Sequence, residues 1–164
     1  MPEPFNIRSF HPDDLPVLHD IRNAAFKPVF QSFRNLVGED IAAIALKNAE
    51  AEQGAFLDTI CSKDSSHTVF IVERGDKLVG FCSISLDMDT KVGEIDLNAV
   101  LPSHQGEGIG AAMFDHALKL MREAGMKAAT VGTGGDDSHA PARRAYEKAG
   151  FGPAIPNVYM YRVL

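Results

Sequence analysis

The sequence predicts an α/β domain with a mixed, largely antiparallel central sheet flanked by helices. Three observations carry this prediction. Segments with the two-residue period of strands are interspersed with segments of helical period along the chain. Residues 68–86 have the pattern of a hairpin, with Gly75 and Asp76 at its turn, which makes neighbouring strands antiparallel. Further on, a strand, a helix and a strand follow one another, and a right-handed crossover of this kind makes its two strands parallel.

The N-terminal part is expected to hold one strand and two helices. Alternation over residues 5–8 predicts a short strand, and His11 with the Pro-Asp-Asp that follows predicts a helix start. Apolar residues at helical spacing then lead to Phe26, Phe30 and Phe33, with the helix broken at Pro28. These aromatic side chains could belong to the hydrophobic core or form one wall of a substrate site. A second helix is expected over residues 39–49, with a further turn at residues 56–60.

The remaining elements follow from periodicity and from glycines at their ends. Strands are expected at residues 68–73, 77–86, 94–101, 127–132 and 158–163. Helices are expected at residues 108–124 and 138–149, because Gly125 and Gly150 each suit a left-handed helix end.

The length of 164 residues favours a single domain over residues 1–164. The net charge is -6, without the Lys/Arg cluster that grips nucleic acid, so no nucleic-acid partner is expected. Cys61 and Cys82 form neither a metal-ligand spacing nor a disulfide framework, so we expect no metal and a cytoplasmic location. No apolar run approaches the ~18 residues of a membrane span, and no membrane partner is expected.

A glycine-rich turn lies between the strand at residues 94–101 and the next helix. It consists of Gln105, Gly106, Glu107, Gly108, Ile109 and Gly110. The first N–H groups of a helix lack intrahelical acceptors, and glycines let an anion approach the backbone closely. The turn lacks the Gly-Lys-Ser/Thr of a P-loop and does not open a dinucleotide-binding unit. We therefore interpret it as a pyrophosphate cradle, with a simple tight turn as the alternative.

Two motifs around this turn resemble those of the GNAT superfamily of acyl-CoA-dependent N-acyltransferases. The family pattern Arg/Gln-x-x-Gly-x-Gly/Ala is matched by Gln105, Gly108 and Gly110. Residues 142–151, with Tyr146 and a terminal Gly-Phe, resemble the family's second helix. The spacing of the motifs also agrees, and the close match covers roughly residues 94–152.

The resemblance implies acetyl-CoA as co-substrate. It implies that the N–H groups of residues 105–110 hold the pyrophosphate, although the carboxylate of Glu107 stands where the family often has a basic residue. The strand ending at Pro102 would receive pantetheine along the backbone of Asn98, Ala99 and Val100; the alternative is a plain strand end. His139 stands where the family commonly has an asparagine that contacts the coenzyme. Arg143 and its neighbour Arg144 could reach the 3′-phosphate.

Amide formation needs a neutral amine, so a base must take a proton. Glu94, Asp96 and Asn98 alternate and are expected to share one strand face. The resemblance implies that Glu94 stands at the position of the general base in some members; Asp96 is next, and His67 and His104 are weaker candidates. Tyr146 stands at the general-acid position. Solvated carboxylates and a core tyrosine are the alternatives.

Together these features predict an N-acetyltransferase that moves the acetyl group of acetyl-CoA to a primary amine by direct attack. The alternatives are a non-catalytic acyl-CoA-binding module of the same fold and, less favoured, another nucleotide-binding protein. The acceptor would be a small-molecule or peptide amine, walled by residues 26–33, 37–60, 132–139 and the C-terminal tyrosines. Pairing through C-terminal strands, common in such folds, makes a homodimer a candidate.

Overall fold

The computed structural model describes residues 3–164 and assembles a five-stranded sheet. The strands lie side by side in chain order: β1 (Phe5–Ser9), β2 (Thr68–Arg74), β3 (Lys77–Asp87), β4 (Val92–Val100) and β5 (Ala128–Val131). The first three pairings are antiparallel, and β4 pairs with β5 in parallel. The predicted mixed, largely antiparallel sheet is confirmed.

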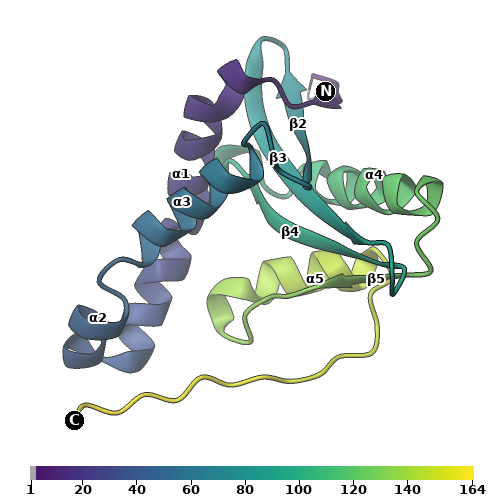
Figure 1. The fold of residues 1–164 in the computed structure, drawn as a ribbon. Helices are drawn as coiled ribbons and strands as arrows, with labels where there is room; N and C mark the ends of the chain where they lie inside the picture. Colours follow the sequence, from purple (N-terminus) through teal and green to yellow (C-terminus); the bar gives the residue numbers. More distant parts are fainter. Residues whose placement is uncertain (1–2) are drawn as a thin grey trace.

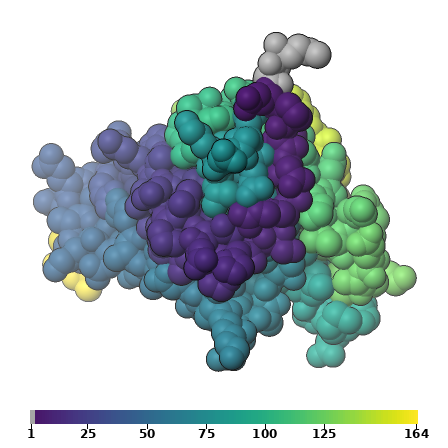
Figure 2. Space-filling model, turned by 90° about the horizontal axis from the view of Figure 1, so that it is seen from above, coloured from purple at the N-terminus to yellow at the C-terminus, as the bar shows by residue number. Residues whose placement is uncertain are grey.

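Helices cover both faces of this sheet (Figure 1). Three come from the first third of the chain: α1 (Leu15–Val37), α2 (Glu39–Ala45) and α3 (Ala49–Ile60). The helix α4 (Ile109–Glu123) joins β4 to β5, and α5 (Ala140–Lys148) follows β5. Short 3-10 turns η1 (Pro12–Asp14), η2 (Pro102–His104) and η3 (Asp137–His139) lie between these elements. From above, the purple and blue N-terminal helices and the green later part of the chain lie on opposite sides (Figure 2).

The alternation of β2 divides the core into two clusters. Val69 and Ile71 pack with α1 and α3 on what we call the α1 face of the sheet. Phe70 and Val72 pack with α4 on the opposite side, the α4 face. The apolar stripe of α4 buries Ile109, Met113, Phe114, Ala117 and Met121. Both faces of the sheet are thus closed by amphipathic helices, as an α/β layer architecture requires.

Two helical predictions are corrected. Pro28 does not end α1, which continues to Val37. An interior proline costs about 3 kcal/mol of helix stability, but the next residues, Val29 and Phe30, are buried and hold the helix in place. The expected turn at residues 56–60 is the end of α3, a helix of 12 residues. Tertiary packing overrides the local signals in both cases.

The predicted strand over residues 158–163 is wrong. Residues 152–164 contain neither strand nor helix, and the segment runs as an extended chain below α5 in the view of Figure 1. Its large apolar side chains are exposed, among them Ile155, Val158, Tyr159 and Met160. The local pattern suits a strand, but a strand also needs an edge to pair with, and no edge within residues 3–164 receives it. None of the described helices is long and apolar enough to cross a membrane.

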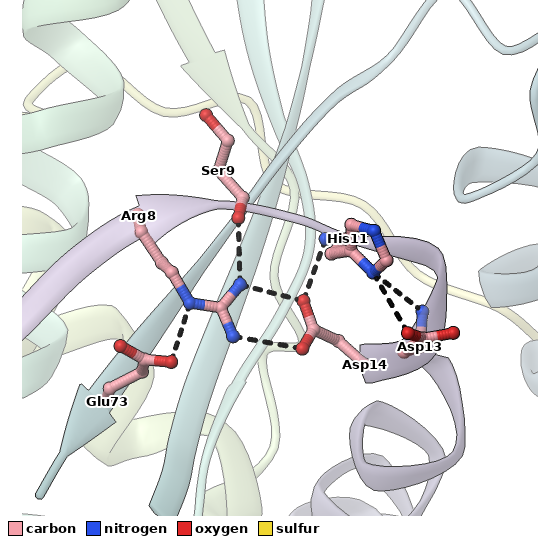
Figure 3. A network of polar contacts seen from close by, with 6 residues as sticks. All are labelled: Arg8, Ser9, His11, Asp13, Asp14 and Glu73. Carbon is pink, nitrogen blue, oxygen red and sulfur yellow. Dashed lines mark hydrogen bonds and ion pairs between the residues drawn. The ribbon is translucent and has the colours of Figure 1, made fainter. Parts of the chain in front are cut away.

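An ionic clamp ties β1 to the start of α1 (Figure 3). The Arg8 guanidinium donates to both oxygens of Asp14, at 2.9 and 3.0 Å, and its Nε donates to Glu73 of β2 at 2.6 Å. Asp14 also accepts the N–H of His11. Arg8 lowers the pKa of Asp14 more than burial raises it. The clamp thereby fixes where α1 begins on the α1 face.

We predict that Asp14→Asn lowers the free energy of unfolding by about 2 kcal/mol at pH 7, because a buried charge-assisted contact is lost. Asp13→Asn, the matched control, removes a carboxylate that is 92% exposed and should have little effect. The pKa of Asp14 is depressed in the folded state, so its contribution is complete above the ordinary carboxyl range. It is lost as the pH falls through the lowered pKa. Urea unfolding should show the Asp14→Asn deficit shrinking with acidification; a pH-independent deficit would contradict this.

Candidate active site

The two parallel strands separate at a defined point. β4 pairs with β5 at Val92, Gly93, Glu94 and Ile95, while β3 follows β4 as far as Val100. No strand among residues 3–164 pairs with the β5-side edge of β4 at residues 96–100. We call this stretch the open edge. It lies at the carboxyl end of a strand, where ligands of α/β sheets commonly bind, and no described strand pairs with its β5 side, although side chains of Asn98 and Gln105 donate to the carbonyls of Asp96 and Val100.

A β-bulge lies where the open edge begins. Cys82 pairs with Asn98 and Ile84 with Ile95, so Ser83 alone lies opposite two residues of β4. The Ser83 hydroxyl donates to the carbonyl of Leu97 at 2.9 Å. Such an extra residue changes which side chains face each side of a sheet.

The bulge corrects the prediction that Glu94, Asp96 and Asn98 share one face. Ile95 packs on the α4 face, so its neighbours Glu94 and Asp96 project to the α1 face. Beyond the bulge, Asn98 bonds to Tyr146, which belongs to the α4-face cluster. Ala99 packs on the α1 face. The structure thus separates the two carboxylates from the amide and brings the amide to the tyrosine.

Tyr146 lies on α5, 7% exposed, against the ring of Phe114. Its phenolic oxygen accepts a hydrogen bond from Asn98 Nδ2 at 3.1 Å, so its own hydrogen remains available to a ligand. Burial raises the pKa of Tyr146, and the bond from Asn98 partly offsets this rise. The phenol therefore stays protonated at neutral pH. Its contact with Asn98 could not be predicted from the sequence, because it depends on the bulge.

The glycine-rich turn opens onto solvent at the start of α4. Gly106 and Gly108 have φ of +80° and +86°, and a Cβ at either glycine would meet no atom within 4 Å. No side chain caps α4, and its first helical bond runs from Ala112 to Gly108. The preceding N–H groups are thus available to an anion. Gln105 Nε2 donates to the Val100 carbonyl at 3.0 Å and fixes the turn to the end of β4.

Glu107 does not leave an uncompensated charge at this turn. Its carboxylate forms an ion pair with Arg74 at the end of β2. The Arg74 side chain is only 12% exposed. No local pattern predicts this partner, because it is 33 residues away in the chain.

Two carboxylates and an imidazole gather on the α1 face. Asp96 Oδ2 lies 3.3 Å from His67 Nε2, and the His67 ring meets Phe56 of α3 edge-on. Glu94 is exposed; partial desolvation and then Asp96 raise its pKa, whereas His67 lowers it. His104 lies in η2 instead, where its ring contacts Ser103. His67, a weaker candidate in the sequence, is therefore the histidine beside the carboxylates.

The loop after β5 is fastened to α1 through Asp136. Ser32 of α1 donates to Asp136 Oδ2 at 2.7 Å, and His139 Nδ1 lies 2.7 Å from Oδ1. Burial opposes ionisation, but hydrogen bonds from Ser138, Ser32 and His139 outweigh it and hold the pKa of Asp136 well below its usual range. The His139 ring also stacks on Phe33 of α1.

Arg143 braces the same loop from α5. Its Nη1 donates to the carbonyls of Gly134 and Asp136, at 2.6 and 2.7 Å. The predicted cofactor contacts of Arg143 and His139 remain predictions, but both side chains already have partners within this loop. Among residues 3–164, no group of three or more His, Cys, Asp or Glu side chains could hold a metal ion.

We predict that Asp136→Ala lowers the free energy of unfolding by about 2 kcal/mol, because three donors lose a buried acceptor. Asp137→Ala is the matched control, since the neighbouring Asp137 is exposed and accepts none of these bonds. Urea titrations at pH 7 measure both variants. Equal stability of the two would contradict the assigned role of Asp136.

Comparisons with known proteins agree with this arrangement. A family model described as acetyltransferase (GNAT) family matches residues 30–151. A mycothiol acetyltransferase of Sanguibacter keddieii is 35% identical over 141 residues, which are 76% of this chain and 44% of that protein. The chain therefore spans less than half the length of this relative.

Two solved structures share the fold. The ribosomal-protein-S18-alanine N-acetyltransferase of Escherichia coli superposes with a TM-score of 0.66 at 18% identity, covering 93% of this chain and 80% of that one. A GNAT family acetyltransferase of Brucella melitensis in complex with acetyl-CoA gives a TM-score of 0.63 at 22% identity, covering 94% and 92%.

Proposed function

Because the chain belongs to the acetyltransferase (GNAT) family, we propose that it transfers the acetyl group of acetyl-CoA to a primary amine by direct attack. The observation that carries this proposal is the meeting of three features at the end of β4. These are the open edge, the uncapped start of α4 and the protonated Tyr146 beside Asn98. A nucleotide site alone would not need a buried phenol whose hydrogen is free.

The features fit two parts of the coenzyme, its pyrophosphate and its pantetheine arm. The N–H groups of the turn, from Gln105 to Gly110, would take the pyrophosphate through charge-assisted bonds. The backbone of Asn98, Ala99 and Val100 on the open edge would pair with the pantetheine amides. Nε2 of His139 would contact the coenzyme from the loop after β5. Arg143 would serve chiefly to hold that loop.

The chemistry then needs two proton transfers. The amine lone pair attacks the thioester carbonyl carbon, the C–N bond forms and the C–S bond breaks. Tyr146 gives its phenolic proton to the departing sulfur, and a carboxylate on β4, Glu94 or Asp96, takes a proton from the nitrogen. Preorganised donors and acceptors of this kind lower the barrier without reorganising at the moment of reaction.

The acceptor is proposed as a small-molecule or peptide amine. One relative is named for mycothiol and one structural neighbour for an alanine of ribosomal protein S18, so both kinds of amine occur among similar proteins. We place the protein in the cytoplasm, where its two free cysteines, Cys61 and Cys82, would stay reduced.

A turnover screen tests the function. Acetyl-CoA is offered with amine classes that include amino sugars, polyamines, amino acids and peptides, and released thiol is measured. We expect turnover with at least one class. Tight coenzyme binding without thiol release in any class would favour the non-catalytic acyl-CoA-binding module.

We predict that Gly108→Glu weakens coenzyme A binding at least tenfold, about 1.4 kcal/mol, because a carboxylate would occupy the anion cradle. Gly125→Glu is the matched control: Gly125 also has a left-handed φ, +81°, and open space around an added Cβ. Both variants carry the same backbone strain, so calorimetry separates strain from repulsion. If Gly108→Glu and Gly125→Glu bind coenzyme A with equal affinity, the turn is not part of the binding site.

We predict that Tyr146→Phe lowers kcat about 100-fold, the usual scale for a lost general acid, with little change in coenzyme A affinity. The ring and its packing on Phe114 persist, so folding should be retained. Urea unfolding and coenzyme A calorimetry of the same variant are the controls for folding and binding. Full activity of Tyr146→Phe would return Tyr146 to a purely structural role.

We also propose a homodimer in which the C-terminal segment, residues 152–164, supplies a strand to a second copy. Its exposed apolar side chains and the outer edge of β5, which pairs with β4 alone in the described chain, support this. A chain ending at Phe151 should then sediment as a monomer; a dimer of that shortened chain would contradict the proposal.

A further inference from the structure

A carboxylate stands in the middle of the turn that we assign to the pyrophosphate. Glu107 lies between Gly106 and Gly108, and residues 102–112 contain no lysine or arginine. A negatively charged side chain among the N–H donors repels a negatively charged ligand. The cation that contacts this turn comes instead from the end of β2, where Arg74 forms an ion pair with Glu107.

Arg74 is bound less completely than a purely structural arginine of the same sheet. Arg8 donates hydrogen bonds to two carboxylates, those of Asp14 and Glu73. Within the described chain, Arg74 donates to Glu107 alone, through Nη1, and its buried Nε has no partner. A guanidinium carries five N–H groups. Arg74 therefore keeps donors available for a second anion.

The ion pair places the Arg74 guanidinium within one glutamate side chain's length of the backbone of the turn. The Glu107 side chain is 35% exposed. A Cβ added at either neighbouring glycine, Gly106 or Gly108, would meet no atom within 4 Å. The carboxylate thus has open space into which it can rotate. A phosphate group bound to the N–H groups of the turn could then take its place at Arg74.

We propose that Arg74 is a coenzyme-binding residue that exchanges the Glu107 carboxylate for the pyrophosphate when the coenzyme binds. This inference rests on the proposed function and adds to its coenzyme site a cation from β2. The planar guanidinium matches phosphate oxygens, to which it donates paired hydrogen bonds. In the free protein Glu107 neutralises Arg74, and in the complex Glu107 turns to solvent. The exchange breaks one ion pair and forms another.

A purely structural ion pair would respond differently to the loss of Glu107. If the pair only fastened the turn to β2, removal of either partner would loosen the turn and weaken coenzyme binding. If Arg74 binds the pyrophosphate, Glu107→Gln frees the guanidinium and removes a repulsive charge, so coenzyme binding becomes tighter. The sign of the Glu107→Gln effect therefore separates the two roles.

Calorimetry with coenzyme A compares Arg74→Gln and Glu107→Gln with the unaltered chain. We expect Arg74→Gln to bind about tenfold more weakly, the scale of one charge-assisted hydrogen bond. Glu107→Gln should bind about threefold more tightly, because a partly exposed ion pair is weak and its loss costs little. Arg74→Lys keeps the charge without the planar fork, so its affinity should lie between those of Arg74→Gln and the unaltered chain.

Two exposed residues of the hairpin between β2 and β3 provide matched controls. Lys77 pairs with Arg74 across the strands, and Asp76 precedes it. Lys77→Gln and Asp76→Asn change the net charge as Arg74→Gln and Glu107→Gln do, and should leave coenzyme affinity unchanged. Urea unfolding of all variants verifies that each is folded. Dephospho-coenzyme A, which has the pyrophosphate but lacks the 3′-phosphate, should show the same loss in Arg74→Gln.

Three results would overturn the assignment of Arg74. They are weaker coenzyme binding by Glu107→Gln, equal affinities of Arg74→Gln and Lys77→Gln, or an Arg74→Gln loss that disappears with dephospho-coenzyme A. If the unaltered chain does not bind coenzyme A, the proposed function and this inference both fail. If it binds coenzyme A but releases no thiol with any amine of the screen, only the proposed function fails.

Discussion

The separation of β4 from β5 after Ile95 is the constraint on which the candidate site depends. A parallel pair that continued to Val100 would satisfy the backbone of β4 and leave nothing for a ligand to bind. Instead the ladder stops, and α4 begins with uncapped N–H groups at the same end of the sheet. Backbone donors and acceptors of two different elements therefore face one region, without the need for a basic side chain.

The bulge opposite Ser83 adds a second consequence, because it divides the proton chemistry between the two faces of the sheet. Asn98 and Tyr146 lie on the α4 face, and Asp96 and His67 lie on the α1 face. Acetyl-CoA bound along the open edge would meet the general acid Tyr146 on the α4 face. The amine would approach it from the α1 face. Asp136 links the loop after β5 to α1 through the hydrogen bond from Ser32.

Local patterns predicted the parts of the fold that local physics controls. The hairpin, the crossover helix α4, the glycine-rich turn and the helix of Tyr146 all have their signals within a few residues. The continuation of α1 through Pro28 and the unpaired C-terminal segment were not predicted, because burial and strand pairing are long-range. One inserted residue between Ile95 and Asn98 places Asn98 on the face opposite Glu94, and only the register with β3 reveals this. The partners Arg74 and Ser32 likewise come from distant elements.

Hydrogen–deuterium exchange with and without coenzyme A tests most directly whether the open edge of β4 is the binding site. If the coenzyme lies along this edge, amides in residues 96–100 and in residues 106–111 should both exchange more slowly in its presence, while the hairpin turn at Gly75 stays unchanged. Protection confined to residues 106–111 at saturating coenzyme A would contradict the account, because the turn would then bind an anion without the strand beside it.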